Sequence, residues 1–143
     1  MNVINWIYII DSSGATILSF ENQIQGTGVS TSALLSHFLF ALQSIAKTLQ
    51  NNEIRSVEMS NNRFFLCKEN MTNYLFIIKT NRDADTRVIT PVLNEIKNKF
   101  LEKFKGHFRL DIEDKIALLN AFKEEIKNIV NEKTNIEKFV DTL

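Results

Sequence analysis

The sequence has few of the residues that mark covalent, metal-dependent or nucleotide chemistry. Its single cysteine, Cys67, excludes an internal disulfide and fits a reducing compartment. Among four glycines, Gly26 and Gly28 lack the third glycine of a dinucleotide-binding motif, and no Walker motif is present. The two histidines, His37 and His107, have no partner residues at metal-ligand spacing. We therefore expect no enzyme activity and no bound cofactor, metal or nucleotide.

An excess of one charge and long apolar runs are also lacking. Lys plus Arg equals Asp plus Glu at 17 each, so no net field attracts the chain to nucleic acid or to an anionic membrane. Lysines gather between 97 and 105, but helical spacing spreads them around the helix, which predicts a solvated surface and no nucleic-acid groove. The early apolar run at 6–10 fits a strand and not a signal peptide, and no stretch is long enough to cross a bilayer. We expect a cytoplasmic protein without direct membrane insertion, peripheral to a membrane only through a partner.

The chain does have enough apolar sequence for one folded domain. Hydrophobic residues make up 44% of the 143 residues, and a chain of this length buries about 70% of its unfolded surface. No repeat, low-complexity tract or linker interrupts it. We expect a single domain over residues 1–143, with a core in 1–105 and a helical extension in 106–143.

Five strands are predicted around one long helix. The turn at 11–14 joins two strands into a hairpin, because Asp bonds to its own backbone and Gly accepts a positive φ. The segments at 6–10 and 74–78 are apolar on both faces, as central strands are. The simplest α+β arrangement is a five-stranded antiparallel sheet of order 2-1-5-4-3, with the long helix on one face and the C-terminal helices on the other. We expect the strands at 6–10, 15–21, 54–59, 63–69 and 74–80, and the long helix at 34–49.

Helical periodicity continues after the strands. A helix is expected over about 85–104, with Pro91 either as its first residue or at a kink. Asp83 and Asp85 can be interpreted as a carboxylate pair, but beside a helix start they fit a cap better. A third helix is expected from about residue 111, followed by a separate short helix whose capping box is Thr134 and Glu137.

The long helix has a broad apolar arc, which we expect to face the core, and a polar side that carries one aromatic residue, Phe40. Two interpretations stay open. Phe40 touches a neighbouring loop of its own chain, or it anchors a partner on an exposed helix. The arc consists of Leu34, Leu35, Phe38, Ala41, Leu42, Ile45, Ala46 and Leu49.

On the second interpretation, Phe40 is the centre of a protein interface. Its polar rim is then formed by Ser36, Gln43, Ser44 and Lys47. Phe40→Asp should leave the fold intact, whereas Phe38→Ala should cost roughly 3–5 kcal/mol as a core truncation. The pair of substitutions separates the two interpretations.

These elements together resemble a known fold. The opening Ile9-Ile10-Asp11-Ser12-Ser13-Gly14, the helix segment at 34–42, the meander of three strands and the close of the next helix at 100–104 resemble a longin domain. Longin domains share a superfamily with roadblock domains, and the likeness is to compact archaeal members. The resemblance covers about residues 3–105.

The resemblance implies a longin/profilin-like fold and a non-catalytic role. Longin and roadblock domains serve small Ras-like GTPases and trafficking complexes as adaptors, scaffolds or exchange-factor subunits, often as a dimer. Implied partners are therefore a small Ras-like GTPase and a like-folded longin/roadblock subunit, in a homodimer or a heterodimer. Arg63 and Arg82 lie near predicted turns, where an arginine finger can reach a nucleotide, although ordinary surface arginines are commoner.

A small-molecule-sensing domain is the alternative function. The eleven phenylalanines either line an apolar cavity between sheet and helix or fill the core, and filling is the commoner use. A pocket of roughly 300–1,000 Å³ under the first helix would favour sensing. A solid core would favour the interaction module.

Overall fold

The computed structural model describes the backbone of residues 4–21, 29–50, 53–104 and 112–141, and the side chains of 4–21, 34–49, 53–104 and 114–132. The described residues form two compact units, which divide between Ala84 and Asp85. We describe each unit by itself. The expected organisation as a single domain with a boundary at 105 and 106 stays a prediction.

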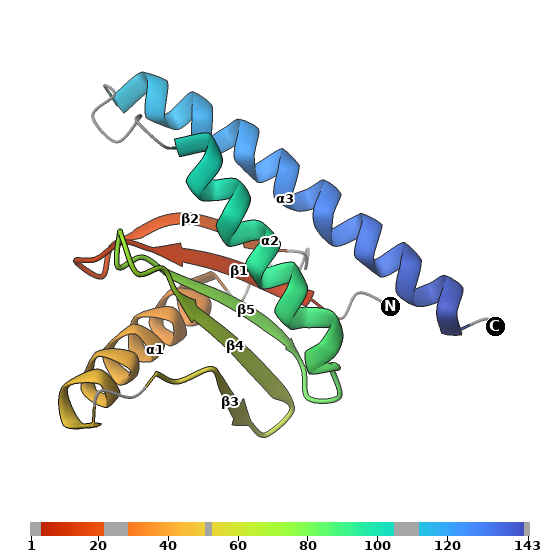
Figure 1. Cartoon of the computed structure of the whole chain (residues 1–143), viewed down its shortest axis with the longest axis horizontal. Helices are drawn as coiled ribbons and strands as arrows, with labels where there is room; N and C mark the ends of the chain where they lie inside the picture. Colours follow the sequence, from red (N-terminus) through yellow and green to blue (C-terminus); the bar gives the residue numbers. More distant parts are fainter. Residues whose placement is uncertain (1–3, 22–28, 51–52, 105–111, 142–143) are drawn as a thin grey trace. The chain divides into compact units, whose positions relative to one another are not determined.

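The first unit contains a five-stranded antiparallel sheet of order β2-β1-β5-β4-β3. This confirms the predicted strand order (Figure 1). The strands are β1 (Ile4–Ile10), β2 (Thr16–Glu21), β3 (Ser56–Met59), β4 (Asn62–Lys68) and β5 (Leu75–Asn81).

The two central strands are the ones that are apolar on both faces. All seven residues of β1 are buried, and so are the first four residues of β5, 75–78. The outer strand β3 has only four residues, three of them exposed, and it pairs with β4 alone. The burial pattern therefore follows the position of each strand in the sheet.

The turn of the β1–β2 hairpin is held in place by the side chain of Asp11. Its carboxylate Oδ1 accepts hydrogen bonds from Ser13 N at 2.9 Å, Ser13 Oγ at 2.6 Å and Ala15 N at 3.0 Å. Burial acts to raise the pKa of the Asp11 carboxyl, but these hydrogen bonds outweigh it and lower that pKa below its ordinary value. Gly14 closes the turn at φ +93°, where a side chain would be strained. The turn is therefore tightly specified, as predicted.

Helix α1 (Val29–Gln50) lies across one face of the sheet (Figure 1). It begins at Val29, five residues before the predicted segment at 34–49. Leu39 is the α1 residue that enters the buried core on this face. That core consists of Trp6, Tyr8, Ile10, Leu39, Phe64, Leu66, Leu75 and Ile77.

The second unit is a pair of helices, α2 (Thr86–Phe104) and α3 (Ile112–Asp141). Asp85 caps α2, because its Oδ1 accepts a hydrogen bond from Arg87 N at 2.9 Å. The interpretation of Asp85 as a cap is thus confirmed, and Pro91 lies inside the helix. Phe122 of α3 contacts Phe100 and Phe104 of α2 edge to face, with ring centroids 5.6 and 6.0 Å apart. The place of these helices on the second face of the sheet stays a prediction.

The prediction of a separate final helix is wrong. Helix α3 runs without a break through Thr134 and Glu137 to Asp141. A Ser/Thr-x-x-Glu pattern starts a helix only where the preceding backbone is not helical already, and here α3 passes through it.

Candidate functional site

Helix α1 is turned opposite to the sequence-based expectation. Ser36 and Leu39 are fully buried and Gln43 is 5% exposed, so this side faces the sheet. Most of the apolar arc faces away from the core instead, although Leu35 packs against the core cluster. Four of its large side chains are exposed to solvent: Leu34 at 71%, Phe38 at 52%, Ile45 at 54% and Leu49 at 74%.

Phe40, the expected centre of the interface, belongs to the inner side of α1. Its ring packs against the core cluster as a half-buried side chain. It also reaches the β1–β2 turn, since a Cβ placed on Gly14 would lie 3.2 Å from Phe40 Cε1. The interpretation in which Phe40 touches a neighbouring loop is therefore the correct one. The exposed aromatic residue on this helix is Phe38, which was expected in the core.

The predicted polar rim is also divided. Ser36 and Gln43 are buried within their own unit, which corrects their placement on an exposed rim, whereas Ser44 and Lys47 are exposed. Gln43 explains much of this orientation. Its Nε2 donates to Ile54 O at 3.1 Å, and its Oε1 accepts from Ile54 N at 2.6 Å. A polar side chain with both hydrogen-bonding groups satisfied can be buried at little cost.

The exposed residues form a continuous band, which we call the outer stripe. Its members recur at intervals of three and four residues, so they lie along one side of α1 over about 22 Å. None of them is charged. Apolar side chains gathered on one side of a helix, rather than scattered singly, are typical of a surface that meets another macromolecule. The outer stripe consists of Leu34, Phe38, Ala41, Ile45 and Leu49.

The sequence contained one indication of this orientation of α1. Leu39 and Phe40 are large apolar residues that fall outside the predicted arc, so α1 is apolar on more than one side. Periodicity alone therefore did not decide which of these sides faces the sheet. The sheet covers the side with Leu39 and Phe40, and most of the arc that was expected in the core is exposed.

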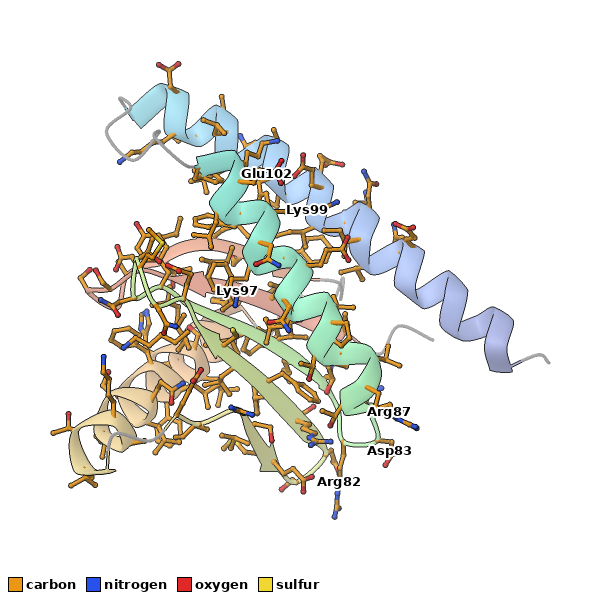
Figure 2. All side chains as sticks on the ribbon, in the orientation of Figure 1. Arg82, Asp83, Arg87, Lys97, Lys99 and Glu102 are labelled. Carbon is orange, nitrogen blue, oxygen red and sulfur yellow. The ribbon has the colours of Figure 1, made fainter. Side chains whose placement is uncertain are left out.

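The two arginines near turns have different environments. Arg63 is held in place: its Nη1 donates to Ala84 O at 3.5 Å, and its guanidinium carbon lies 4.8 Å from the centroid of Phe65. Arg82 is exposed after β5, and Figure 2 shows its side chain projecting away from the ribbon. Arg63 is therefore a structural residue, and of these two only Arg82 is free to meet a partner.

The residues weighed for chemistry do not gather into a site. Cys67 is half-buried in β4 and His37 is exposed on α1. Among the residues with described side chains, no three ligands of the His, Cys, Asp or Glu type lie close enough to hold a metal ion. His107 lies outside the described residues. No described helix is both long and apolar enough to cross a membrane.

A hollow of about 80 Å³ lies beside α1 in the first unit. This volume is several times smaller than the pocket of a drug-sized apolar effector, and the lining is partly polar. The hollow therefore does not supply the apolar cavity that the sensing alternative needs. It is lined by Ser12, Phe40, Gln43, Ser44, Lys68, Asn73 and Leu75.

The sheet order and the helix across it define the class of fold: this is the fold shared by longin and roadblock domains. The expectation drawn from the sequence is confirmed at this level, and the archaeal type stays a prediction. No family model matches the sequence, and no curated protein matches it either.

Solved structures give the particular likenesses. The chain is similar to a structure of the mammalian SRP receptor, at 9% identity and a TM-score of 0.60, over 96% of this chain and 99% of that one. It is also similar to the Roadblock/LC7 domain from Streptomyces avermitilis, at 13% identity and a TM-score of 0.50, over 69% and 87% of the two chains. Myxococcus xanthus MglB has a TM-score of 0.49 at 15% identity, over 69% and 85%. At these identities the likeness is one of fold.

Proposed function

We propose that the protein is a non-catalytic interaction module of the longin type. It acts as an adaptor, scaffold or regulatory subunit for a small Ras-like GTPase in a trafficking-type system of the cytoplasm. It does so as a dimer with a like-folded domain, and the simplest such partner is a second copy of this chain. The observation that carries the proposal is the outer stripe of α1, which is apolar, regular and exposed.

The size of the outer stripe fits a dimer interface. Its four large side chains are each more than half exposed, which gives a patch of roughly 300–600 Å² on one subunit, the size range of the largest functional apolar patch of a monomer. Pairing two copies removes this area twice, or roughly half of the 1,200–2,000 Å² that a specific interface buries in total. Neighbouring side chains, such as half-buried Leu42 and exposed Thr48, supply further area.

The charge distribution of α1 fits pairing with its own copy. Lys47 is the only Lys, Arg, Asp or Glu between 34 and 49, and it projects away from the outer stripe. Two stripes therefore meet without a like-charge contact and without a desolvated charge. A surface that carries no charge of its own is compatible with an isologous dimer.

Support for the GTPase partner is of a different kind. It comes from what longin and roadblock domains are known to do, while the fold likeness makes this chain a candidate for the same role. The outer stripe supports the dimer, and the fold supports the GTPase. The two parts are tested separately.

The dimer is tested by measuring molar mass in solution. The parent protein should sediment as a dimer, and Phe38→Asp should convert it into a folded monomer, because a carboxylate cannot be desolvated in the paired stripe. Leu49→Asp is a second variant at the end of the stripe. Met71→Asp is the matched control, since Met71 is 89% exposed in the β4–β5 turn and lies outside α1. A monomeric parent, or equal dimerisation of Phe38→Asp and Met71→Asp, contradicts the dimer.

The GTPase role is tested by capture of purified small Ras-like GTPases in their GDP-bound and GTP-analogue-bound states. We expect retention of one GTPase with a clear preference between the two states. Rates of nucleotide release and hydrolysis, with and without this protein, then distinguish exchange, activation of hydrolysis and tethering. Failure of every GTPase to bind in either state contradicts this part of the proposal and leaves the dimer intact.

A further inference from the structure

The residue sizes of the outer stripe are almost symmetric about its middle. Ala41 is the one small side chain, and it lies next to the midpoint of the stripe, between residues 41 and 42. Phe38 and Ile45 lie at equal distances on the two sides of this midpoint, and Leu34 and Leu49 lie at equal distances farther out. A surface with this symmetry can pair with a reversed copy of itself, because each large side chain then meets a large side chain of the partner.

The two flanks of the outer stripe differ in chemistry. At about 100° per residue, Leu42 lies about 60° to one side of the stripe, whereas Thr48 and His37 lie about 60–80° to the other side. Leu42 is half-buried and apolar, while Thr48 and His37 are exposed and polar. The stripe therefore has one apolar flank and one polar flank.

This difference distinguishes two ways of pairing the helices. In a two-fold dimer with antiparallel α1 helices, the apolar flank of one subunit faces the apolar flank of the other, and the two polar flanks face each other. With parallel helices, each apolar flank would face a polar flank, so Leu42 would lose an apolar contact. The helix dipoles also favour the antiparallel orientation, because opposite ends then lie side by side.

Side-chain volume favours the same orientation. Antiparallel pairing places one Phe and one Ile on each side of the two-fold axis, so the space between the helices is filled equally on both sides. Parallel pairing would place Phe38 against its own copy and Ile45 against its own copy, which holds the helices farther apart at one level than at the other. Ala41 lies at the crossing in the antiparallel case, where a small side chain allows close approach.

We propose that two copies of this chain pair through antiparallel α1 helices, with the two-fold axis beside Ala41. The inference rests on the proposed dimer and adds the orientation of the partner. Phe38 of one subunit then packs against the partner's Ile45, and Leu34 packs against the partner's Leu49. The apolar flanks close one side of this interface, and the polar flanks form its solvated rim.

The orientation is tested by cross-linking single cysteines in a Cys67→Ala background, which removes the one native thiol. Leu34→Cys and Leu49→Cys are treated with a short bifunctional maleimide, each alone and as an equimolar mixture. Antiparallel pairing brings position 34 of one subunit next to position 49 of the other, but keeps the two copies of position 34 about 22 Å apart along the helix axis. We expect covalent dimers in the mixture and in neither variant alone. Met71→Cys, exposed in the β4–β5 turn, measures cross-linking by random collision.

Failure of the orientation and failure of the dimer give different results. Cross-linking of each variant alone would show parallel helices and overturn the orientation, while the dimer would stand. Cross-linking of the mixture no stronger than that of Met71→Cys, in a protein that sediments as a dimer, would place α1 outside the interface and also overturn the inference. A monomeric parent would contradict the proposed dimer, and the orientation with it.

Substitutions at Ala41 test the position of the two-fold axis. Ala41 is exposed, so a single subunit tolerates a charge there, but the axis brings two copies of that charge together. Ala41→Glu and Ala41→Lys should each raise the Kd of dimerisation at least about tenfold, because like charges are then desolvated side by side. An equimolar mixture of the two variants should form a heterodimer that is tighter than either homodimer. Homodimers as tight as the parent, or no gain in the mixture, would place the axis away from Ala41 and overturn the proposal.

Discussion

The side chain of Gln43 binds the backbone of Ile54 in the way that a neighbouring strand would. Ile54 N donates to Gln43 Oε1 at 2.6 Å, and Gln43 Nε2 donates to Ile54 O at 3.1 Å. Ile54 precedes β3 by two residues and has no strand on the side of α1. One amide on the helix therefore satisfies the donor and the acceptor of this residue and fixes the rotation of α1 about its axis.

Replacement of Gln43 by methionine should destabilise the protein by about 1–3 kcal/mol, since both backbone groups of Ile54 lose their partner while side-chain volume is kept. Ser44→Ala is the control on the same helix and should stay within about 0.5 kcal/mol, because Ser44 is exposed. Urea unfolding measures both values. Equal stability of Gln43→Met and the parent would show that water replaces the amide.

The exposure of Phe38 and the packing of Phe40 against the core give a second prediction. Phe40→Ala should cost about 2–4 kcal/mol, because the half-buried ring leaves a cavity against the core. Phe38→Ala should change the stability of the monomer by no more than about 0.5 kcal/mol. The comparison requires unfolding at a protein concentration low enough to exclude association. The opposite ranking would return α1 to the orientation expected from the sequence.

Contact between Phe40 and the β1–β2 turn leads to a third prediction. Gly14→Ala places a Cβ at φ +93° and 3.2 Å from Phe40 Cε1, so it should cost about 1–3 kcal/mol from backbone strain and contact together. Phe40→Leu frees space but leaves φ unchanged. In a double-mutant cycle, the cost of Gly14→Ala should therefore fall in the Phe40→Leu background without vanishing. Strict additivity would mean that the close approach carries no energy.

Ionisation of Tyr8 makes the free energy of unfolding depend on pH in the alkaline range. Burial, together with the charge of Glu21 and a 3.3 Å hydrogen bond to it, raises the pKa of Tyr8 from 10.0 to about 12. Between these values the unfolded chain has lost a proton that the folded protein keeps. This contribution to stability is therefore complete below pH 10 and is lost as the pH rises through about 12.

Tyr8→Phe should consequently make the free energy of unfolding fall less steeply between pH 10 and about 12 than it does in the parent. Tyr74, whose pKa is raised by burial and by the charge of Asp11, titrates in both proteins and does not affect the comparison. Urea unfolding at a series of pH values gives the two slopes. Identical slopes would exclude a raised pKa at Tyr8.

The packing of α2 on α3 depends on an aromatic contact more than on the ion pair between Lys103 and Glu125. Phe122→Ala should cost about 3–5 kcal/mol, because Phe122 is fully buried and meets both Phe100 and Phe104. Lys103→Gln breaks the 3.0 Å pair with Glu125, but both groups are partly exposed and the cost should be about 0–1 kcal/mol. Thermal unfolding of the two variants tests this ranking.

The strand order was predictable because the burial of a strand can be recognised from its amino-acid composition. The segments that became β1 and the first half of β5 are apolar on both faces, and only central strands have that pattern. The α2 cap was predictable for a similar local reason, since Asp85 bonds to an amide two residues away. Both inferences use residues that are close in the sequence.

The orientation of α1 was not predictable in this way. Helical periodicity identifies an apolar side but does not say whether that side meets the same chain or another one. The contacts that decide it, Gln43 with Ile54 and Phe40 with Gly14, join segments separated by a loop or a strand. To predict the orientation of α1, one would have had to search for backbone groups that a polar side chain on the apparent outer side, such as Gln43, could bind.

With the proposed interface on its outer side, α1 tolerates few substitutions on either side. In an ordinary amphipathic helix the inner half is restricted and the outer half varies freely among polar residues. Here the inner half needs a small hydroxyl at Ser36, a large aliphatic residue at Leu39 and an amide at Gln43, while a polar replacement along the outer stripe would remove part of the proposed interface. On this proposal the segment from 34 to 49 should be the least variable stretch of the chain, although the five residues of the outer stripe add little to the stability of an isolated subunit.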